Sequence, residues 1–215
     1  MSLMPRPLRI DFDGAWHHVM NRGAGQDTIF TDTLDRTIFL ELLAEAPTRN
    51  GVAVHAYCLM GNHFHLLLEN LGGSVPAAMK ELTSRFTRRR NARTGRDGPV
   101  FRGRYRSVAV LTDAHRLMVS HYIHLNPVIA GMCARAQDWH WSSARCYLEI
   151  GPAPEWLTTA ALLDQFAGTA GDNYAQFLSY GIDPLTEAFY SRERLGNLFE
   201  PAVSGTCVSQ VPDTQ

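Results

Sequence analysis

Two apolar stretches separated by only two residues constrain the fold of this 215-residue chain most strongly. Residues Val52–Met60 and His63–Glu69 both have the composition of β-strands, and Gly61-Asn62 between them suits a tight turn. The pair therefore predicts an antiparallel β-hairpin. Because Leu66-Leu67-Leu68 is apolar at consecutive positions, the second strand is expected to be buried and central in a sheet.

The flanking segments alternate between extended and helical patterns. Asp32 is a candidate N-cap for the first helix, and Asn50-Gly51 is expected to end it. The expected elements are a strand at Trp16–Arg22, a helix at Thr33–Arg49, the hairpin, a helix at Pro76–Arg93, a strand at Val100–Leu111, and a helix from Thr112 to Asn126, where Pro127 follows. This order predicts the α+β class, with a ferredoxin-like antiparallel sheet and helices on one face.

The composition changes after Trp141-Ser142-Ser143, and Gly151-Pro152-Ala153-Pro154 resembles a linker. We expect a main domain over 1–150 and a helical C-terminal appendage over 151–200, with short helices at Thr158–Gly168 and Asn173–Tyr180. The polar residues 201–215 are expected to be a disordered tail.

The chain has no uncharged apolar run of about 18 residues, so we expect no membrane association. Its cysteines, Cys58, Cys133, Cys146 and Cys207, are far apart and form no Cys-x-x-Cys pair. They predict free thiols in a reducing cytoplasm.

Charge is distributed very unevenly along the chain. Residues 80–106 contain ten basic residues and only two acidic ones, which gives a net charge of +8, although the whole chain has a net charge of −1. Residues 148–215 have a net charge of −7. An asymmetry of this size indicates a surface that binds a polyanion; the alternative is an ordinary solvated helix face.

His63 and His65 lie two positions apart on a predicted strand, so both side chains project from one face. Two imidazoles at this spacing can hold one divalent metal ion. By parity Glu69 shares their face, and it is a candidate rim ligand or proton handler. The alternative is a pair of half-exposed histidines without a metal.

Tyr122 and Asn126 lie four residues apart on a predicted helix and therefore share a face. A tyrosine hydroxyl can attack a phosphodiester and conserve the bond energy in a phosphotyrosine. An Asn126 oxygen would add a hard donor to the two imidazoles, a mixture that suits Mg²⁺ or Mn²⁺. Taken singly, Tyr122 could be a core residue and Asn126 a helix cap.

Tyr105 is a rival nucleophile, because it lies in an arginine-rich segment. The alternation of that segment would place its arginines on one face, where they could hold phosphates while aromatic rings stack on bases. The residues expected to bind DNA are Arg85, Arg88, Arg89, Arg93, Arg102, Arg104, Tyr105 and Arg106.

Taken together, these motifs resemble the REP-associated tyrosine transposases, a branch of the single-tyrosine HUH transposases. The resemblance covers about Ala15 to Tyr147, and its two specific segments are His63-Phe64-His65 and Tyr122 to Pro127. Three further segments are His18-Val19-Met20-Asn21-Arg22-Gly23, Phe101-Arg102-Gly103-Arg104-Tyr105 and Trp141-Ser142-Ser143. The chain departs from the family pattern at Gly61, where proline is usual, and at Ile129, where arginine is common.

The resemblance implies an HUH nuclease fold over 1–150, with Tyr122 as the nucleophile and His63, His65 and Asn126 as the ligands of Mg²⁺ or Mn²⁺. The implied substrate is single-stranded DNA with hairpins, cleaved to a 5′-phosphotyrosine and a free 3′-hydroxyl. The protein would be associated with the bacterial nucleoid, as a monomer or a homodimer. Two other functions stay open, a hairpin-binding protein that does not cut and a metallohydrolase that uses water as its nucleophile.

Overall fold

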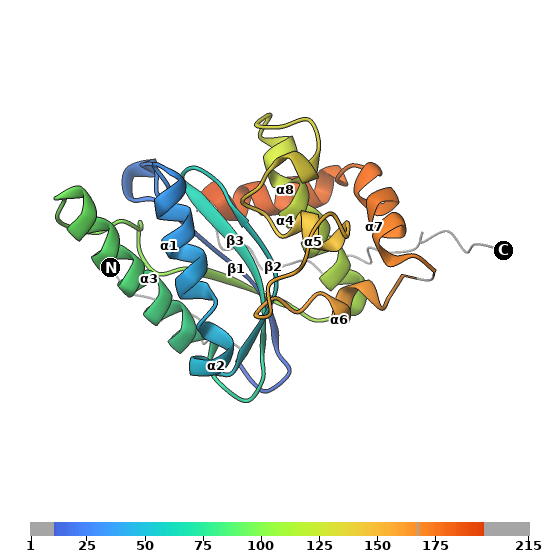
Figure 1. Ribbon diagram of the computed structural model, residues 1–215, viewed down its shortest axis with the longest axis horizontal. Helices are drawn as coiled ribbons and strands as arrows, with labels where there is room; N and C mark the ends of the chain where they lie inside the picture. Colours follow the sequence, from blue (N-terminus) through green and yellow to red (C-terminus); the bar gives the residue numbers. More distant parts are fainter. Residues whose placement is uncertain (1–10, 167, 196–215) are drawn as a thin grey trace, which may run out of the picture.

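A four-stranded antiparallel sheet organises the computed structural model, which describes residues 11–166 and 168–195 (Figure 1). The order across the sheet is β2-β3-β1-β4. The strands are β1 (Trp16–Arg22), β2 (Val52–Leu59), β3 (His63–Asn70) and β4 (Arg106–Val110). The predicted hairpin is β2 and β3, and β3 is a central strand. The predicted α+β class and antiparallel sheet are therefore confirmed.

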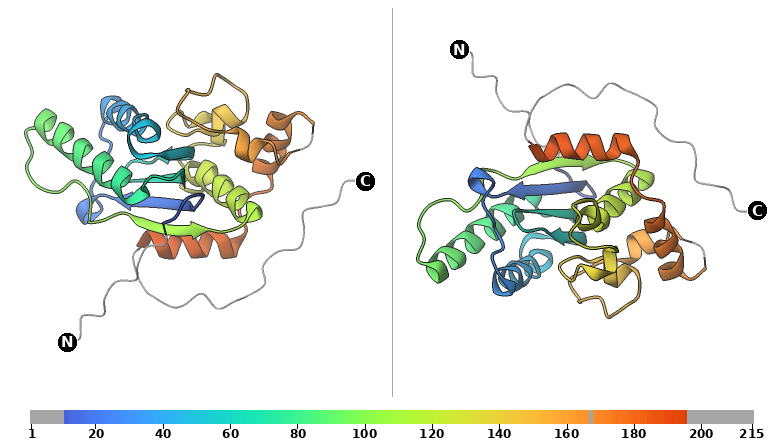
Figure 2. Two further views of the ribbon diagram at one scale, coloured as in Figure 1. Left: turned by 90° about the horizontal axis from the view of Figure 1, so that it is seen from below. Right: turned by 90° about the horizontal axis from the view of Figure 1, so that it is seen from above.

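Helices cover both faces of this sheet, whereas the sequence pattern led us to expect them on one face. One face carries α1 (Thr33–Leu43), α2 (Ala46–Asn50) and α3 (Val75–Thr94). The other carries α4 (Asp113–Ile129), α5 (Ala144–Tyr147), α6 (Ala160–Leu163), α7 (Ala170–Ser179) and α8 (Pro184–Leu195). Figure 2 shows the sheet between α1 and α3 on one side and α8 on the other. Short 3₁₀ turns lie at Ala24–Gln26 and Ala136–Asp138.

The alternation of β3 explains why both faces are covered. Phe64, Leu66 and Leu68 pack into the core beneath α1 and α3. Leu67 packs into a second core beneath α4, and it shares its face with His63 and His65. A strand that is apolar on both faces needs cover on both, and the helices after β4 provide the second layer.

Local sequence signals set the start of α1 and the end of α2. The Asp32 carboxylate accepts a hydrogen bond from the Asp35 N–H at 2.9 Å, as expected of an N-cap, and Gly51 ends α2 with a φ of 60°. The predicted helix over Thr33–Arg49 is interrupted after Leu43, and a short second helix begins at Ala46 with Pro47 in its first turn.

Two expected boundaries are wrong. α4 does not end at Asn126 but continues through Pro127 to Ile129, and the Ala130 N–H still bonds to the Asn126 carbonyl at 3.0 Å. Proline removes only its own backbone donor, so a helix can continue for its last turn. The predicted strand over Val100–Leu111 is limited to Arg106–Val110, because residues 102–104 form a bend.

Residues beyond the proposed boundary at 150 pack on the same sheet as the main domain. The Thr158 N–H donates to the Val54 carbonyl at 2.9 Å, and Tyr174 lies in the core beneath α4. The division at 150 stays a prediction, and the expected tail 201–215 lies outside the described residues. Within 11–166 and 168–195, no helix has the length and apolar character needed to cross a membrane.

Candidate active site

The three predicted metal ligands meet in the layer between β3 and α4. His63 Nε2 lies 3.4 Å from Asn126 Oδ1, and His65 Nε2 lies 3.4 Å from Asn126 Nδ2. Asn126 is fully buried and His65 nearly so, while His63 keeps 9% of its surface exposed. His65 and Asn126 are 61 positions apart in the chain, yet they meet, and the atoms in contact are those that would face a metal ion.

The outer ring nitrogens of the two histidines are held by other side chains. His63 Nδ1 lies 2.7 Å from Asn62 Oδ1, and the Asn62 amide is oriented by the Gln26 carbonyl at 3.4 Å. Because a carbonyl oxygen only accepts, His63 Nδ1 carries the proton in this contact. His65 Nδ1 lies 3.0 Å from His18 Nε2. If the proton of His65 lies on Nδ1 as well, the lone pair of its Nε2 also points at Asn126.

This proton arrangement fits a bound cation. The Asn126 amide can donate to one imidazole Nε2, but its oxygen then faces the lone pair of the other at 3.4 Å. A cation between them would turn these facing lone pairs into ligand bonds. In the part of the chain that the structure describes, no three His, Cys, Asp or Glu side chains cluster as a metal site. The set therefore depends on the amide of Asn126 and contains no carboxylate.

Tyr122 lies one helical turn before Asn126 on α4, beside the predicted ligands of its own chain. Its ring meets the ring of His65 edge to face, with centroids 5.5 Å apart. Tyr190 of α8 stacks on its other side, with centroids 4.6 Å apart and planes inclined by 29°. The Tyr190 hydroxyl in turn lies 3.2 Å from His115 Nε2. Tyr122 is fully buried in this arrangement.

The other histidines of α4 have structural contacts. His124 Nε2 lies 2.8 Å from Ser143 Oγ and His124 Nδ1 lies 2.7 Å from the Tyr174 hydroxyl, so the ring ties α4 to α5 and α7. Burial lowers the pKa of His124 to about 3. His121 Nε2 lies 3.0 Å from the Phe177 carbonyl, and burial lowers its pKa to about 4. Both rings are therefore neutral at pH 7.

Glu69 does not belong to this site. It shares the face of His65 but lies near the other end of β3, where it pairs with His55 at 3.0 Å. Glu69 is four positions from His65 and six from His63. Sharing a face does not bring residues this far apart into contact, because a strand rises by about 3.3 Å per residue.

Most of the basic residues of α3 form ion pairs with α1 and α2. Arg85 binds Glu45 through two bonds, Arg89 lies 3.6 Å from Glu41, and Arg93 contacts Asp32 and the buried Asp35. A simple charge count therefore overstates the positive charge that this helix presents to a partner. These pairs fasten α3 to the neighbouring helices.

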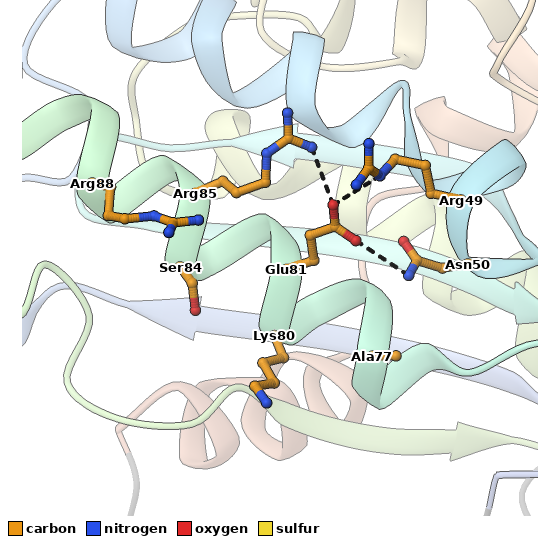
Figure 3. A pocket seen from close by; sticks show the side chains of 8 residues that line it. All are labelled: Arg49, Asn50, Ala77, Lys80, Glu81, Ser84, Arg85 and Arg88. Atoms are coloured by element: carbon orange, nitrogen blue, oxygen red, sulfur yellow. Dashed lines mark hydrogen bonds and ion pairs between the residues drawn. The ribbon is translucent and has the colours of Figure 1, made fainter.

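Arg88 and Lys80 are the α3 cations that form no ion pair with any described residue. They line a shallow groove of about 530 Å³ together with Arg49, Asn50, Ala77, Glu81, Ser84 and Arg85 (Figure 3). Glu81 binds Arg49 and Arg85, which leaves Arg88 and Lys80 as the cations of this groove without a carboxylate partner.

The arginine-rich segment before β4 differs from the predicted extended groove. Arg102 and Arg104 are exposed, but they lie in a bend, so the strict alternation with Arg106 is lost. Tyr105 is only 7% exposed and packs in the core beneath α1 and α3. Its ring is not accessible to a base, and its core lies on the opposite face of the sheet from His63 and His65. Tyr105 is therefore not beside the predicted metal ligands, and this packing does not support its predicted role in binding DNA.

Three contacts of this site were missed by sequence reasoning: His18, Asn62 and Tyr190. Alternation along the first predicted strand puts His18 on one face with Trp16 and Met20. The register that sets Met20 opposite His65 comes only from the paired strands. No local signal connects Tyr190 with Tyr122, because 68 residues separate them.

The antiparallel sheet thus places paired imidazoles beside a helix that carries a tyrosine and an amide, groups that can bind a divalent cation next to a hydroxyl. The family described as "Transposase IS200 like" matches residues 12–126, more than half of the chain. The protein belongs to the IS200-like transposase family. A search among curated proteins found no match.

One solved structure supports the fold. A REP-associated tyrosine transposase bound to a REP hairpin overlaps with a TM-score of 0.58 at 16% identity, over 78% of this chain and 97% of that chain. A putative transposase from Deinococcus radiodurans R1 is also 16% identical, over 60% of this chain and 98% of that one, but its TM-score of 0.39 is too low to support a shared fold.

Proposed function

We propose that this transposase cleaves and rejoins single-stranded DNA at hairpin sequences through a phosphotyrosine on Tyr122. The observation that carries the proposal is the convergence of His63, His65 and Asn126 one helical turn from Tyr122. Their donor atoms suit Mg²⁺ or Mn²⁺, which when bound would neutralise charge on the scissile phosphate as a Lewis acid.

The chain's own residues would contribute positioning and the nucleophile. As the bond between the Tyr122 oxygen and phosphorus forms, the bond from phosphorus to the 3′-oxygen breaks. The hydroxyl proton passes to solvent, and the leaving oxygen takes up a proton to become a 3′-hydroxyl. The phosphotyrosine keeps the bond energy, so a second 3′-hydroxyl can reverse the step and join a new strand. Because Tyr122 lies beside the His65 of its own chain, one protomer supplies both nucleophile and ligands.

Hairpin DNA is the substrate that the basic surfaces favour. Arg88 and Lys80 of the α3 groove and the exposed Arg102 and Arg104 can neutralise phosphates without breaking an ion pair. Arg85, Arg89 and Arg93 would first have to leave their carboxylates, so we give them a smaller share of the binding. The structural relative bound to a REP hairpin motivates the choice of a hairpin substrate.

The test uses labelled single-stranded hairpin DNA from sequence that flanks the gene, with Mn²⁺ or with EDTA. Denaturing gels should show a protein–DNA adduct that requires Mn²⁺ and disappears in Tyr122→Phe. A matched control is Tyr180→Phe, because Tyr180 is 67% exposed and directly follows α7, outside the site. An adduct that persists in Tyr122→Phe would remove Tyr122 as the nucleophile.

The burial of Tyr122 beneath Tyr190 favours a second candidate, a protein that binds hairpins without cutting them. This function predicts retarded hairpin DNA on a native gel with EDTA present and no adduct with any metal ion. The same gels therefore separate the two functions.

A further inference from the structure

His18 of β1 contacts the metal-ligand set from the strand next to β3. Its Nε2 lies 3.0 Å from His65 Nδ1, and both rings are buried. The register of the two strands fixes this contact, because Met20 pairs with His65 and His18 pairs with Leu67. His18 is therefore the diagonal neighbour of His65 on the face that carries the site.

The direction of this hydrogen bond follows from the chemistry proposed for His65. If His65 binds a metal through Nε2, its Nδ1 must carry the proton and donate it. His18 Nε2 then accepts, and the remaining proton of His18 lies on its own Nδ1. That atom is buried and has no hydrogen-bond partner among the described residues.

The unpartnered Nδ1 indicates why a histidine stands here. A buried polar atom without a partner lowers stability, and an apolar side chain would pack in this position without that loss. Among the described residues, the ring has one polar contact, the hydrogen bond to His65.

We propose that His18 is a positioning residue that fixes the tautomer and the ring orientation of the metal ligand His65. The inference rests on the proposed metal site. It completes a symmetrical arrangement, because Asn62 holds His63 through Nδ1 in the same way. Each ligand histidine then has its own acceptor, a half-exposed amide for His63 and a fully buried imidazole for His65.

The first experiment measures Mn²⁺ affinity by calorimetry for three variants. The side-chain amide of Gln reaches the place of the histidine Nε2, whereas that of Asn reaches only the place of Nδ1. His18→Gln should therefore bind Mn²⁺ within about threefold of wild type, while His18→Asn and His18→Phe should lose about 10–100-fold, as is typical of a lost outer partner. His17→Gln is the matched control, because His17 bonds to Ser107 on the other face of β1.

Unchanged Mn²⁺ affinity in His18→Phe and His18→Asn, with only the melting temperature altered, would show that His18 is merely structural. The second experiment needs neither a variant nor a metal. Long-range ¹H–¹⁵N correlations of the metal-free protein should show the proton of His65 on Nδ1, and a proton on Nε2 would overturn the proposal. Wild type that binds no Mn²⁺ would refute the metal site itself, while the tautomer would still decide the role of His18.

Discussion

Tyr190 is the side chain whose loss we expect to increase DNA cleavage most. It is 1% exposed and stacks on Tyr122, which is fully buried. A phosphodiester cannot reach a buried hydroxyl, so if Tyr122 is the nucleophile, as we propose, α8 has to leave the site before the reaction. We call the observed arrangement closed and the arrangement without α8 over Tyr122 open. The rate of cleavage should then depend on the fraction of open molecules.

The packing of Tyr190 sets the size of the effect. A buried tyrosine removes about 150–250 Å² from water, worth about 4–6 kcal/mol as an upper limit at about 25 cal/mol per Å². Truncation of a large buried aromatic side chain to alanine costs about 3–5 kcal/mol in practice. Taking about 3 kcal/mol for Tyr190→Ala, and about 1.4 kcal/mol per tenfold change, the ratio of open to closed molecules should rise on the order of 100-fold.

The assay is single-turnover formation of the protein–DNA adduct with Mn²⁺ and hairpin DNA. Tyr190→Ala should form the adduct faster by up to the same factor, until opening no longer limits the rate. Tyr190→Phe keeps the stacked ring and loses the hydroxyl that lies 3.2 Å from His115 Nε2, so it should stay within about threefold of wild type. An unchanged adduct rate in Tyr190→Ala, together with a lower melting temperature, would refute the idea that α8 limits access.

Three further changes test the site and its support. Asn126→Ala should weaken Mn²⁺ binding more than about tenfold by calorimetry, because loss of an outer partner alone costs about that much. Asp35→Asn should lower the free energy of unfolding by about 3–5 kcal/mol at pH 7. Burial raises the pKa of Asp35, but hydrogen bonds from Thr31 and Arg93 outweigh it and hold the pKa below 3.8. Urea titrations should therefore show that the difference in free energy of unfolding between wild type and Asp35→Asn becomes smaller as the pH falls below 3.8. Because the pKa of buried His124 is about 3, this residue should not lower the free energy of unfolding above pH 6.5. Below pH 6.5 its contribution should lower that free energy by up to about 1.4 kcal/mol per pH unit. Thermal melts at pH 7, 6 and 5 should show a shallower fall in His124→Gln.

Features governed by neighbouring residues could be predicted from the sequence. The hairpin, the N-cap at Asp32 and the C-cap at Gly51 depend on a few adjacent residues, and the structure has them where expected. Alternation on β3 was enough to place His63 and His65 on one face. Helical spacing likewise placed Tyr122 and Asn126 one turn apart.

Features that depend on distant segments could not be predicted. The acidic partners of Arg85, Arg89 and Arg93 lie on or beside α1 and α2, outside the segment whose charge was counted. Tyr105 follows the bend before β4 and is buried, although its neighbours Arg104 and Arg106 suggested a surface strand. Such pairings depend on which helices the sheet brings together, and a linear charge pattern does not contain that information.

Access of a metal ion and access of DNA to this site should depend on different parts of the structure. Tyr190 lies over Tyr122, whereas His63, on the far side of His65, keeps an exposed edge in the closed arrangement. An ion can therefore reach the proposed ligands without displacement of α8, but a DNA strand cannot reach the proposed nucleophile. Tyr190→Ala should then change the adduct rate and leave Mn²⁺ affinity within about threefold of wild type. A variant that changed both by the same factor would show that metal and DNA share one opening step, and that α8 also controls access to the ligands.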